Sequence, residues 1–275
     1  MDRTSIELRK KIFLAAYSAG IGHLASAFSC VDIIYALYLC GIMRHDPNNP
    51  FWDDRDIFVL SKGHGSLALY TVLAEAGYIS QSELYKFCRP EATLGGEPHW
   101  LETPGVEAST GSLGHGLSIA MGMALALKSD NKDNQVYCLI GDGECQEGSI
   151  WEAVVSAPGF KLDNLTAIID NNRLQKMDFI KNIIGTDALG QQFESFGWQV
   201  KQADGHNVED IANKTTGHWE PDKPHCIIAE TVKGKGVSLM EDAPGWHWRM
   251  PGKKELKTFC KELGIDDSEL KAARE

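Results

Sequence analysis

Two short β-rich runs joined by a helical stretch most constrain the fold of this chain. The runs are VYCLIG (136–141) and LTAIID (165–170), and between them residues 147–161 carry apolar positions at helical spacing. A strand, a helix and a second strand in this order form a βαβ unit, in which the two strands are parallel. The sequence therefore predicts that both strands end at the same edge of one sheet.

The same alternation continues toward the C-terminus. WQVKQA (198–203) and HCIIAETV (225–232) are two further strand candidates, separated by a helix candidate at 207–213. Alternating strands and helices with nearly continuous apolar strands are typical of a mostly parallel sheet that helices cover on both faces, so we expect an α/β fold. The first half is largely helical by its periodicity, with apolar positions at helical spacing in 4–18, 31–43, 66–76, 81–88 and 115–128.

No repeat, low-complexity tract or linker-like run divides the chain. One continuous domain over residues 1–275 is the simplest interpretation, and this length is sufficient for a large core. The last stretch, 252–274, is predicted to form two short charged helices at the periphery.

Charge and apolar content exclude several classes of partner. The chain has 27 Lys and Arg against 38 Asp and Glu, a net charge of −11, which disfavours nucleic-acid backbones and anionic membranes as partners. Its longest apolar stretch, 33–43, is far shorter than the roughly 20 residues of a membrane span. The charged start lacks the features of a secretory signal, so we expect a cytoplasmic protein. The seven cysteines form no CxxC pair and are interpreted as free thiols.

Polar loops follow the predicted strands at 141–148, 170–174 and 233–249, on the edge where parallel α/β sheets bind ligands. Asp142, in GDG, directly follows one strand, and Asn172, in NN, follows the next. Their oxygens are hard ligands of the kind that Mg²⁺ or Ca²⁺ prefers, and the glycines allow a phosphate to approach the backbone. The alternative is an ordinary strand-to-helix turn with Asp142 as a cap. The arrival of both side chains at one edge favours the metal site.

The segment from GDG to NN is the centre of a longer resemblance. GDGECQEGSIWEAVVSAPGFKLDNLTAIIDNN (141–172) resembles the thiamine diphosphate signature, and GDGECQEG resembles transketolase more narrowly. The resemblance extends over most of the chain through SAGIGHLASAFSCVDIIYALY, DIFVLSKGHGSLALY, TPGVEASTGSLGHGLSIAMGMALA, DGHN and TVKGKGVS. It implies the thiamine diphosphate-binding fold of the transketolase family, with thiamine diphosphate and Mg²⁺ or Ca²⁺ as cofactors.

The resemblance also implies the residues of the site. The metal would be held by the side chains of Asp142 and Asn172 and by the backbone carbonyl of Leu174, and Gly143 would lie against the diphosphate. The full set of implied cofactor-binding residues is His64, Gly111, Ser112, Leu113, Gly141, Asp142, Gly143, Glu144, Asn172 and His247.

Three of the nine histidines are assigned to catalysis by the same resemblance, namely His23, His64 and His247. His23 and His64 each follow a glycine, as in a loop that meets a ligand, and neutral imidazole suits proton transfer near pH 7. His206, in DGHN, is intermediate between a functional and a structural interpretation. An ordinary core or surface role is expected for His45, His99, His218 and His225.

One position departs from the family pattern. Family members commonly have GHP about six residues before TPGVE, and the histidine there contacts the donor sugar. This chain has GEP, with Glu97 in that place and His99 two residues later. A carboxylate in place of an imidazole changes both charge and hydrogen-bonding capacity, so the donor sugar is left open. A milder change is His115, where glutamine is usual.

Two glutamates after GDG have two interpretations. Glu147 and Glu152 could form an acidic first turn that complements the helix dipole. The family resemblance instead implies that they belong to a hydrogen-bonded subunit interface.

The resemblance ends at the diphosphate-binding domain, whereas full-length transketolases are more than twice as long. The part without a counterpart supplies the family's catalytic glutamate and its pyrimidine-binding domain. The resemblance therefore implies the N-terminal subunit of a split transketolase. Such a subunit would act with a C-terminal subunit, as a heterotetramer, to transfer a two-carbon ketol unit from a ketose or its phosphate to an aldose or its phosphate. The alternatives are a deoxyxylulose-phosphate synthase-like or 2-oxoacid dehydrogenase-like subunit, a specialised ketol transferase with a non-standard donor, and a regulatory homologue without turnover.

Overall fold

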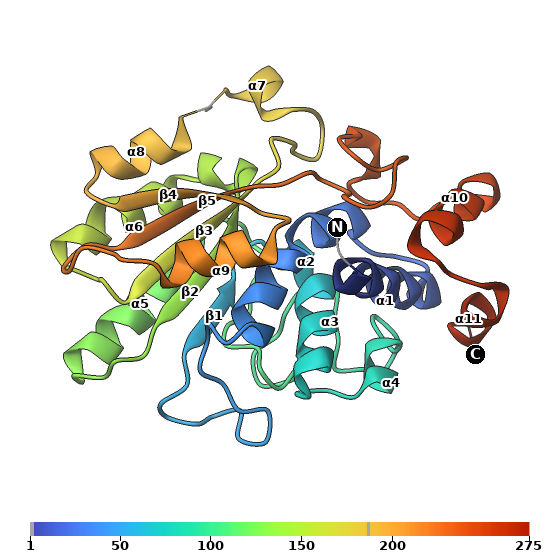
Figure 1. Cartoon of the computed structure of the whole chain (residues 1–275), viewed down its shortest axis with the longest axis horizontal. Helices are drawn as coiled ribbons and strands as arrows, with labels where there is room; N and C mark the ends of the chain where they lie inside the picture. Colours follow the sequence, from blue (N-terminus) through green and yellow to red (C-terminus); the bar gives the residue numbers. More distant parts are fainter. Residues whose placement is uncertain (1–2, 186–187, 275) are drawn as a thin grey trace.

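A five-stranded parallel sheet forms the centre of the molecule (Figure 1). The computed structural model describes residues 3–185 and 188–274. The strand order is β1-β2-β3-β5-β4, and each neighbouring pair is parallel, which confirms the predicted sheet. The strands are β1 (Ile57–Leu60), β2 (Val136–Gly141), β3 (Leu165–Asn171), β4 (Gln199–Asp204) and β5 (His225–Glu230).

Helices cover both faces of the sheet because alternate strand residues point to opposite sides. On β2, Leu139 belongs to one buried cluster, while Cys138 and Ile140 belong to the other. The first cluster is completed by α1 (Arg3–Ala19), α2 (Leu24–Leu39), α3 (Ser66–Ala76) and α9 (Val208–Thr216). The second is completed by α5 (Gly116–Ser129), α6 (Gly148–Gly159) and α8 (Leu189–Ser195).

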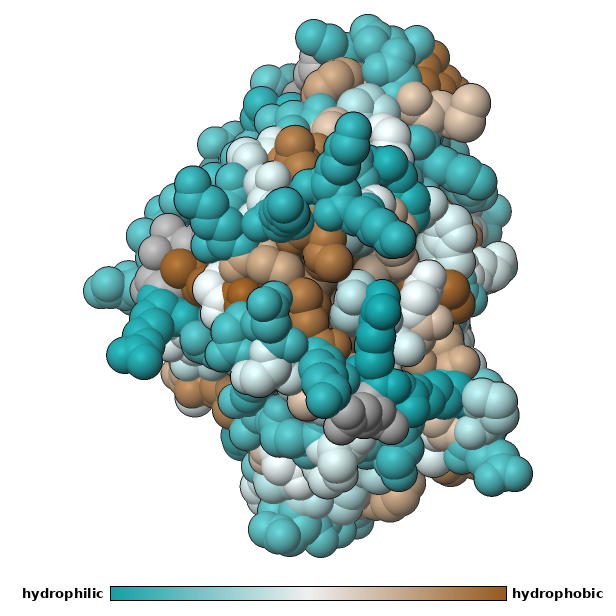
Figure 2. Space-filling model, turned by 90° about the vertical axis from the view of Figure 1, so that its right-hand side faces the viewer, coloured by the Kyte–Doolittle hydropathy of each residue, from teal (hydrophilic) through white to brown (hydrophobic). Residues whose placement is uncertain are grey.

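The last two helices, α10 (Lys253–Leu263) and α11 (Asp267–Ala272), lie beside α1 and away from the sheet (Figure 1). The attachment of α10 is apolar, since the ring of Phe259 is fully buried 5.2 Å from that of Phe13. Figure 2 views the molecule from this side and shows hydrophilic residues over most of the face, with apolar groups near its middle. Two helical segments at the end of the chain were expected, and both are present.

Several expected boundaries were wrong. The helix expected at 31–43 begins at Leu24 and ends at Leu39, because almost all of α2 is buried and its apolar pattern therefore has no clear start. The helix expected at 81–88 is a single turn, α4 (Gln81–Leu84), and Cys88 has a left-handed backbone with a φ of 54°. The strand β1 was not expected, because four apolar residues are too short for a periodic signal.

The segment after β3 also contains elements that the periodicity did not indicate. These are the short helix α7 (Ile180–Ile183) and the helix α8 that covers the end of the sheet. Within the part of the chain that the structure describes, no helix combines the length and apolar character of a membrane span.

Candidate active site

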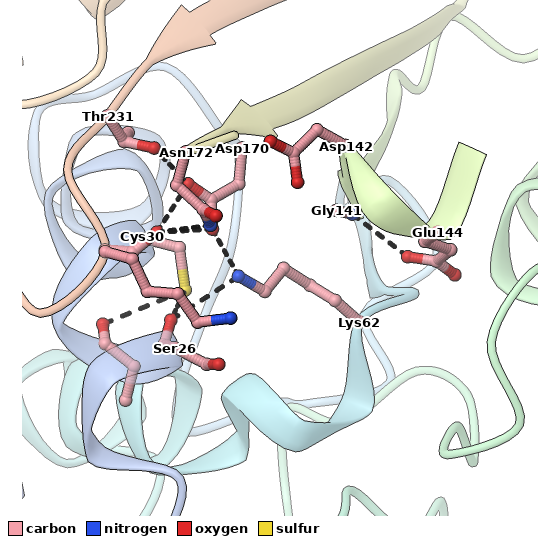
Figure 3. A network of polar contacts seen from close by, with 12 residues as sticks. Ser26, Cys30, Lys62, Gly141, Asp142, Glu144, Asp170, Asn172 and Thr231 are labelled. Carbon is pink, nitrogen blue, oxygen red and sulfur yellow. Dashed lines mark hydrogen bonds and ion pairs between the residues drawn. The ribbon is translucent and has the colours of Figure 1, made fainter. Parts of the chain in front are cut away.

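The carboxyl ends of β2 and β3 meet as the sequence predicts. Gly141 is paired with Asp170 in the parallel register, so Asp142 and Asn172 follow at neighbouring points of the same edge (Figure 3). The backbone N–H of Arg173 donates a hydrogen bond to Oδ2 of Asp142, which joins the two loops directly. Residues about thirty positions apart are thus brought to one place by strand pairing.

Asp142 is a buried carboxylate without an ion-pair partner among the described residues. It is 2% exposed and accepts hydrogen bonds from the N–H groups of Gly143, at 2.7 Å, and Arg173. Burial, followed by the negative charge of Asp170, raises the pKa of Asp142 to about 7. A carboxylate held this way is stabilised by a cation placed beside it.

Beside Asp142, Lys62 and Asp170 form an ion pair that is almost completely removed from solvent (Figure 3). Asp170 also accepts hydrogen bonds from Ser29, at 2.6 Å, and from the hydroxyl of Thr231. Burial opposes ionisation of Asp170, but the Lys62 ammonium and these hydroxyls hold its pKa below the ordinary value. Breaking such a pair from one side leaves an uncompensated buried charge, which typically costs about 3–5 kcal/mol.

A second buried lysine contacts one of the metal ligands that the resemblance implies. Lys233 is 3% exposed, and its ammonium donates to the carbonyl of Leu174 at 2.8 Å and lies 3.3 Å from Nδ1 of His247. Burial, followed by the charge of Lys62, lowers the pKa of Lys233 to about 8. Two ammonium groups therefore converge on the edge where a diphosphate is expected.

The three oxygen donors implied for the metal suit a hard divalent cation. Asp142 supplies a carboxylate, Asn172 an amide oxygen that accepts from the N–H of Leu174 at 3.1 Å, and Leu174 a backbone carbonyl. The described residues contain no group of three or more His, Cys, Asp or Glu side chains that could hold a metal. A ligand set with one carboxylate, one amide and one carbonyl is compatible with that finding, because Mg²⁺ commonly takes its other ligands from phosphate and water.

The three histidines assigned to catalysis form one cluster. The ring centroids of His23, His64 and His247 lie 5.2–5.6 Å from one another, and the ring of Trp248 lies 4.2 Å from that of His23. A cavity of about 490 Å³ opens beside them, with Lys176 in its wall. The structure therefore brings together three side chains that come from distant segments of the sequence.

All three imidazoles are neutral at pH 7. Burial, followed by the charge of Lys233, lowers the pKa of His23 to about 4 and that of His247 to about 3. Burial, followed by the charge of Lys62, lowers the pKa of His64 well below its ordinary value. A neutral imidazole can both donate and accept a hydrogen bond, so the cluster can bind hydroxyl groups and exchange protons with them.

The loop that contains Gly111, Ser112 and Leu113 is held against the two strand ends by Glu144. The Glu144 carboxylate accepts hydrogen bonds from the hydroxyl of Ser61 and from the N–H groups of Gly114, at 2.8 Å, and Gly141, at 3.0 Å. Its carboxylate thereby joins this loop to the ends of β1 and β2. Burial raises the pKa of this carboxyl group.

A glycine permits the close approach of this loop to the end of β1. A Cβ at Gly116 would lie 2.4 Å from Cβ of Ser61 and 2.6 Å from its Cα. These distances are shorter than any that real Cβ atoms adopt, so a side chain here would separate the loop from the strand.

Glu97 lies against this loop. Its Oε2 lies 1.9 Å from the position that a Cβ of Gly111 would take, and its backbone carbonyl accepts a hydrogen bond from the hydroxyl of Tyr70 at 3.0 Å. His99 does not take its place, because it is an exposed side chain 3.6 Å from Glu102. The carboxylate therefore faces Gly111, one of the residues that the resemblance assigns to cofactor binding.

Two histidines and two glutamates considered in the sequence lie outside the histidine cluster. His45 bonds the carbonyl of Tyr38 at 2.7 Å, and His225 is buried against the ring of Trp219, as an ordinary core role requires. Glu147, which immediately precedes α6, and Glu152, on α6, are both exposed, so neither of the two interpretations is decided.

Comparison with known proteins identifies the fold and its cofactor-binding domain. The protein-family model described as "Transketolase, thiamine diphosphate binding domain" matches residues 8–275 of this chain. The chain belongs to the transketolase family. The resemblance inferred from the sequence motifs is thereby confirmed, as is the thiamine diphosphate-binding fold.

Two relatives have nearly the length of this chain. It is 40% identical over 255 residues to one of the subunits of the apulose-4-phosphate transketolase of Actinobacillus succinogenes, covering 93% of this chain and 92% of that protein. It is 41% identical over 223 residues to a 6-deoxy-6-sulfo-D-fructose transketolase subunit of Clostridium sp., covering 81% of each.

Solved transketolases have the same fold within a longer chain. The transketolase of Campylobacter jejuni superimposes with a TM-score of 0.85 at 30% identity, covering 99% of this chain but 46% of its own. The chain therefore spans less than half the length of that transketolase.

Sequence reasoning missed the two buried lysines of this site. Lys62 stands in SKGH and Lys233 in VKGKG, both within the blocks that resemble transketolase, but only the histidine of the first block was assigned a role. A lysine beside a glycine in such a block was the available signal. Asp170, the last residue of an otherwise apolar strand candidate, was a second one.

Proposed function

We propose that this chain is the thiamine diphosphate-binding subunit of a two-subunit transketolase. With a separate subunit that carries a pyrimidine-binding domain, it would transfer a two-carbon ketol unit from a ketose or its phosphate to an aldose or its phosphate. One observation carries the proposal. The oxygen donors that suit a metal, the two buried lysine ammonium groups and the three neutral imidazoles all lie at one edge of the sheet. The names of the two relatives of similar length, which are called subunits, support a partner.

The residues of this chain would bind the cofactor from its diphosphate end. Asp142, Asn172 and the carbonyl of Leu174 would hold Mg²⁺, which neutralises the buried carboxylate. Lys233 donates to that carbonyl in this structure, and its ammonium is positioned to pair with a diphosphate oxygen. When bound, thiamine diphosphate supplies the nucleophilic carbon of the reaction.

The histidine cluster would act on the sugar. His23 and His247 line the cavity of about 490 Å³, and their low pKa values keep them neutral, so that each can donate and accept a hydrogen bond with a hydroxyl of the sugar. The walls of the cavity also exclude bulk water from one side of the substrate. Lys176, which is exposed at the cavity, favours an anionic substrate such as a sugar phosphate.

The test is ketol transfer from xylulose 5-phosphate to ribose 5-phosphate by this chain alone and by the chain co-expressed with its pyrimidine-domain partner. Calorimetry of thiamine diphosphate with Mg²⁺ is measured alongside. We expect transfer only by the pair. Full activity of the chain alone would contradict the need for a partner, and a pair that neither reacts nor binds the cofactor would overturn the function.

A specialised donor is a second candidate, and Glu97 is the observation that favours it. The carboxylate lies where family members place a histidine, and it faces Gly111. We expect Glu97→His to change the relative rates with different donors while cofactor affinity changes less than threefold. The control is Glu102→His, an exposed glutamate nearby. Unchanged donor preference in both variants would make Glu97 irrelevant to donor selection.

A further inference from the structure

The backbone segment Val232–Lys235 carries Lys233 into the site, and residues outside the site hold it. The N–H of Val232 donates to Nε2 of His206 at 2.9 Å, and the N–H of Gly234 donates to the carbonyl of Ala25 at 3.0 Å. The segment is therefore tied on both sides of Lys233. On one side the bond is to a side chain, His206, which lies outside the site described above.

The hydrogen bonds of His206 define its tautomer. Because Nε2 accepts the N–H of Val232, the ring proton lies on Nδ1, which is 2.9 Å from Oδ2 of Asp32 and donates to it. The imidazole thus connects a carboxylate on α2 to the backbone that follows β5. An imidazole bonded through both nitrogens has a fixed ring orientation.

Asp32 is a rigid anchor for this histidine. Both Asp32 and Arg9 are completely buried, and the guanidinium of Arg9 donates to the two carboxylate oxygens at 2.6 and 3.0 Å. Arg9 also donates through Nε to the carbonyl of Lys235 at 2.8 Å. The same buried pair therefore holds the Val232–Lys235 segment directly at one end and through His206 at the other.

We propose that His206 is a positioning residue that directs Lys233 to the diphosphate site. The proposal rests on the proposed function, since it requires thiamine diphosphate as the ligand. Lys233 adjoins the residue that His206 holds, and its ammonium reaches the carbonyl of Leu174 from that position. A lysine side chain is flexible, so fixing its backbone reduces the entropy that is lost when the ammonium binds an anion. His206 itself contacts neither the metal ligands nor the histidine cluster.

Two substitutions separate the two hydrogen bonds of His206. In His206→Gln, the side-chain oxygen can reach the place of Nε2 and accept from Val232, while the bond to Asp32 is lost. In His206→Asn, the shorter amide reaches only the place of Nδ1, so it can keep the bond to Asp32 but not the one to Val232. His206→Ala removes both and serves if the Asn variant proves unstable.

The experiment is calorimetric titration of the full chain, co-expressed with its pyrimidine-domain partner, with thiamine diphosphate and Mg²⁺. Thermal unfolding is measured as a check of folding. We expect His206→Asn and His206→Ala to raise the Kd about tenfold and His206→Gln to raise it less than threefold. In a Lys233→Ala background, His206→Asn should raise the Kd no further, because His206 acts through that lysine. Equal losses in the Gln and Asn variants, or the same loss with and without Lys233, would overturn the positioning role. Absence of binding by the unsubstituted chain together with its partner would instead overturn the proposed function itself.

Discussion

Replacing the proposed metal ligand Asp142 by asparagine is expected to stabilise the chain in the absence of metal. The carboxylate is buried and its pKa is raised from 3.8 to about 7, by burial first and by the charge of Asp170 second. The folded chain therefore holds this proton more tightly than the unfolded chain does. It follows that ionisation of Asp142 reduces stability as pH rises from about 4 to about 7, and that the loss is complete above pH 7.

The magnitude follows from the shift. One pKa unit corresponds to about 1.36 kcal/mol, so a rise from 3.8 to about 7 reduces the free energy of unfolding by about 4 kcal/mol near pH 7. Asparagine removes that charge but offers one oxygen to the two N–H groups of Gly143 and Arg173, and leaving one unpaired costs about 1–3 kcal/mol. The net expectation is a gain of about 1–3 kcal/mol, or about 2–4 °C in Tm for each kcal/mol in a chain of this size.

The assay is thermal unfolding of the Asp142→Asn chain at pH 7.5 and pH 5, with and without Mg²⁺ and thiamine diphosphate. The gain in Tm should be larger at pH 7.5 than at pH 5. Mg²⁺ and thiamine diphosphate should raise the Tm of the unsubstituted chain but not that of the Asp142→Asn chain. The matched control is Asp170→Asn, which should cost about 3–5 kcal/mol because it leaves the Lys62 ammonium unpaired. An Asp142→Asn chain that melts at or below the temperature of the unsubstituted chain at pH 7.5 would refute the reasoning.

Two further predictions follow from the histidine cluster and from the Gly116 contact. His23 and His247, with pKa values of about 4 and about 3, should show no titration in their imidazole NMR signals between pH 8 and pH 5, and a midpoint near 6.5 in either would contradict their burial. Because the same histidines take up protons in the unfolded chain, Tm should fall as pH decreases from 7 to 5 in the Asp142→Asn chain, where the opposite contribution of Asp142 is removed. Gly116→Ala should cost about 1–3 kcal/mol in chemical denaturation by forcing the loop away from Ser61. Gly122→Ala in the same helix, where nothing lies within 4 Å, should be neutral or stabilising, and equal effects of the two would refute the steric argument.

The sheet edge was predictable because strand periodicity and topology decide it. Once 136–141 and 165–170 are parallel neighbours, Asp142 and Asn172 must arrive together, and the paired register of Gly141 with Asp170 shows that they do. The histidine cluster was found by another route. His23, His64 and His247 come from three distant segments, and only the resemblance of motifs to a family placed them in one site.

Buried ion pairs and fully buried helices were not predictable in the same way. Lys62 and Asp170 stabilise each other only after folding, and the weak sequence signal at each position does not identify the other as its partner. The start of α2 was missed because a helix buried all round has no polar face to define its period. The contacts of Glu144 were not predictable for a related reason, since its carboxylate bonds to backbone groups whose positions no local pattern reveals.

The hydrogen bonds of Asp170 have a consequence for the order of events during folding. Its partners Ser29, Lys62 and Thr231 lie 141, 108 and 61 residues away along the chain. Contacts between such distant segments form slowly, since each requires a long loop to close. The network cannot be completed until Thr231 has been synthesised and β5 has joined the sheet. A nascent or partly unfolded chain should therefore lack the binding site altogether, so that capture of the diphosphate marks molecules that have finished folding.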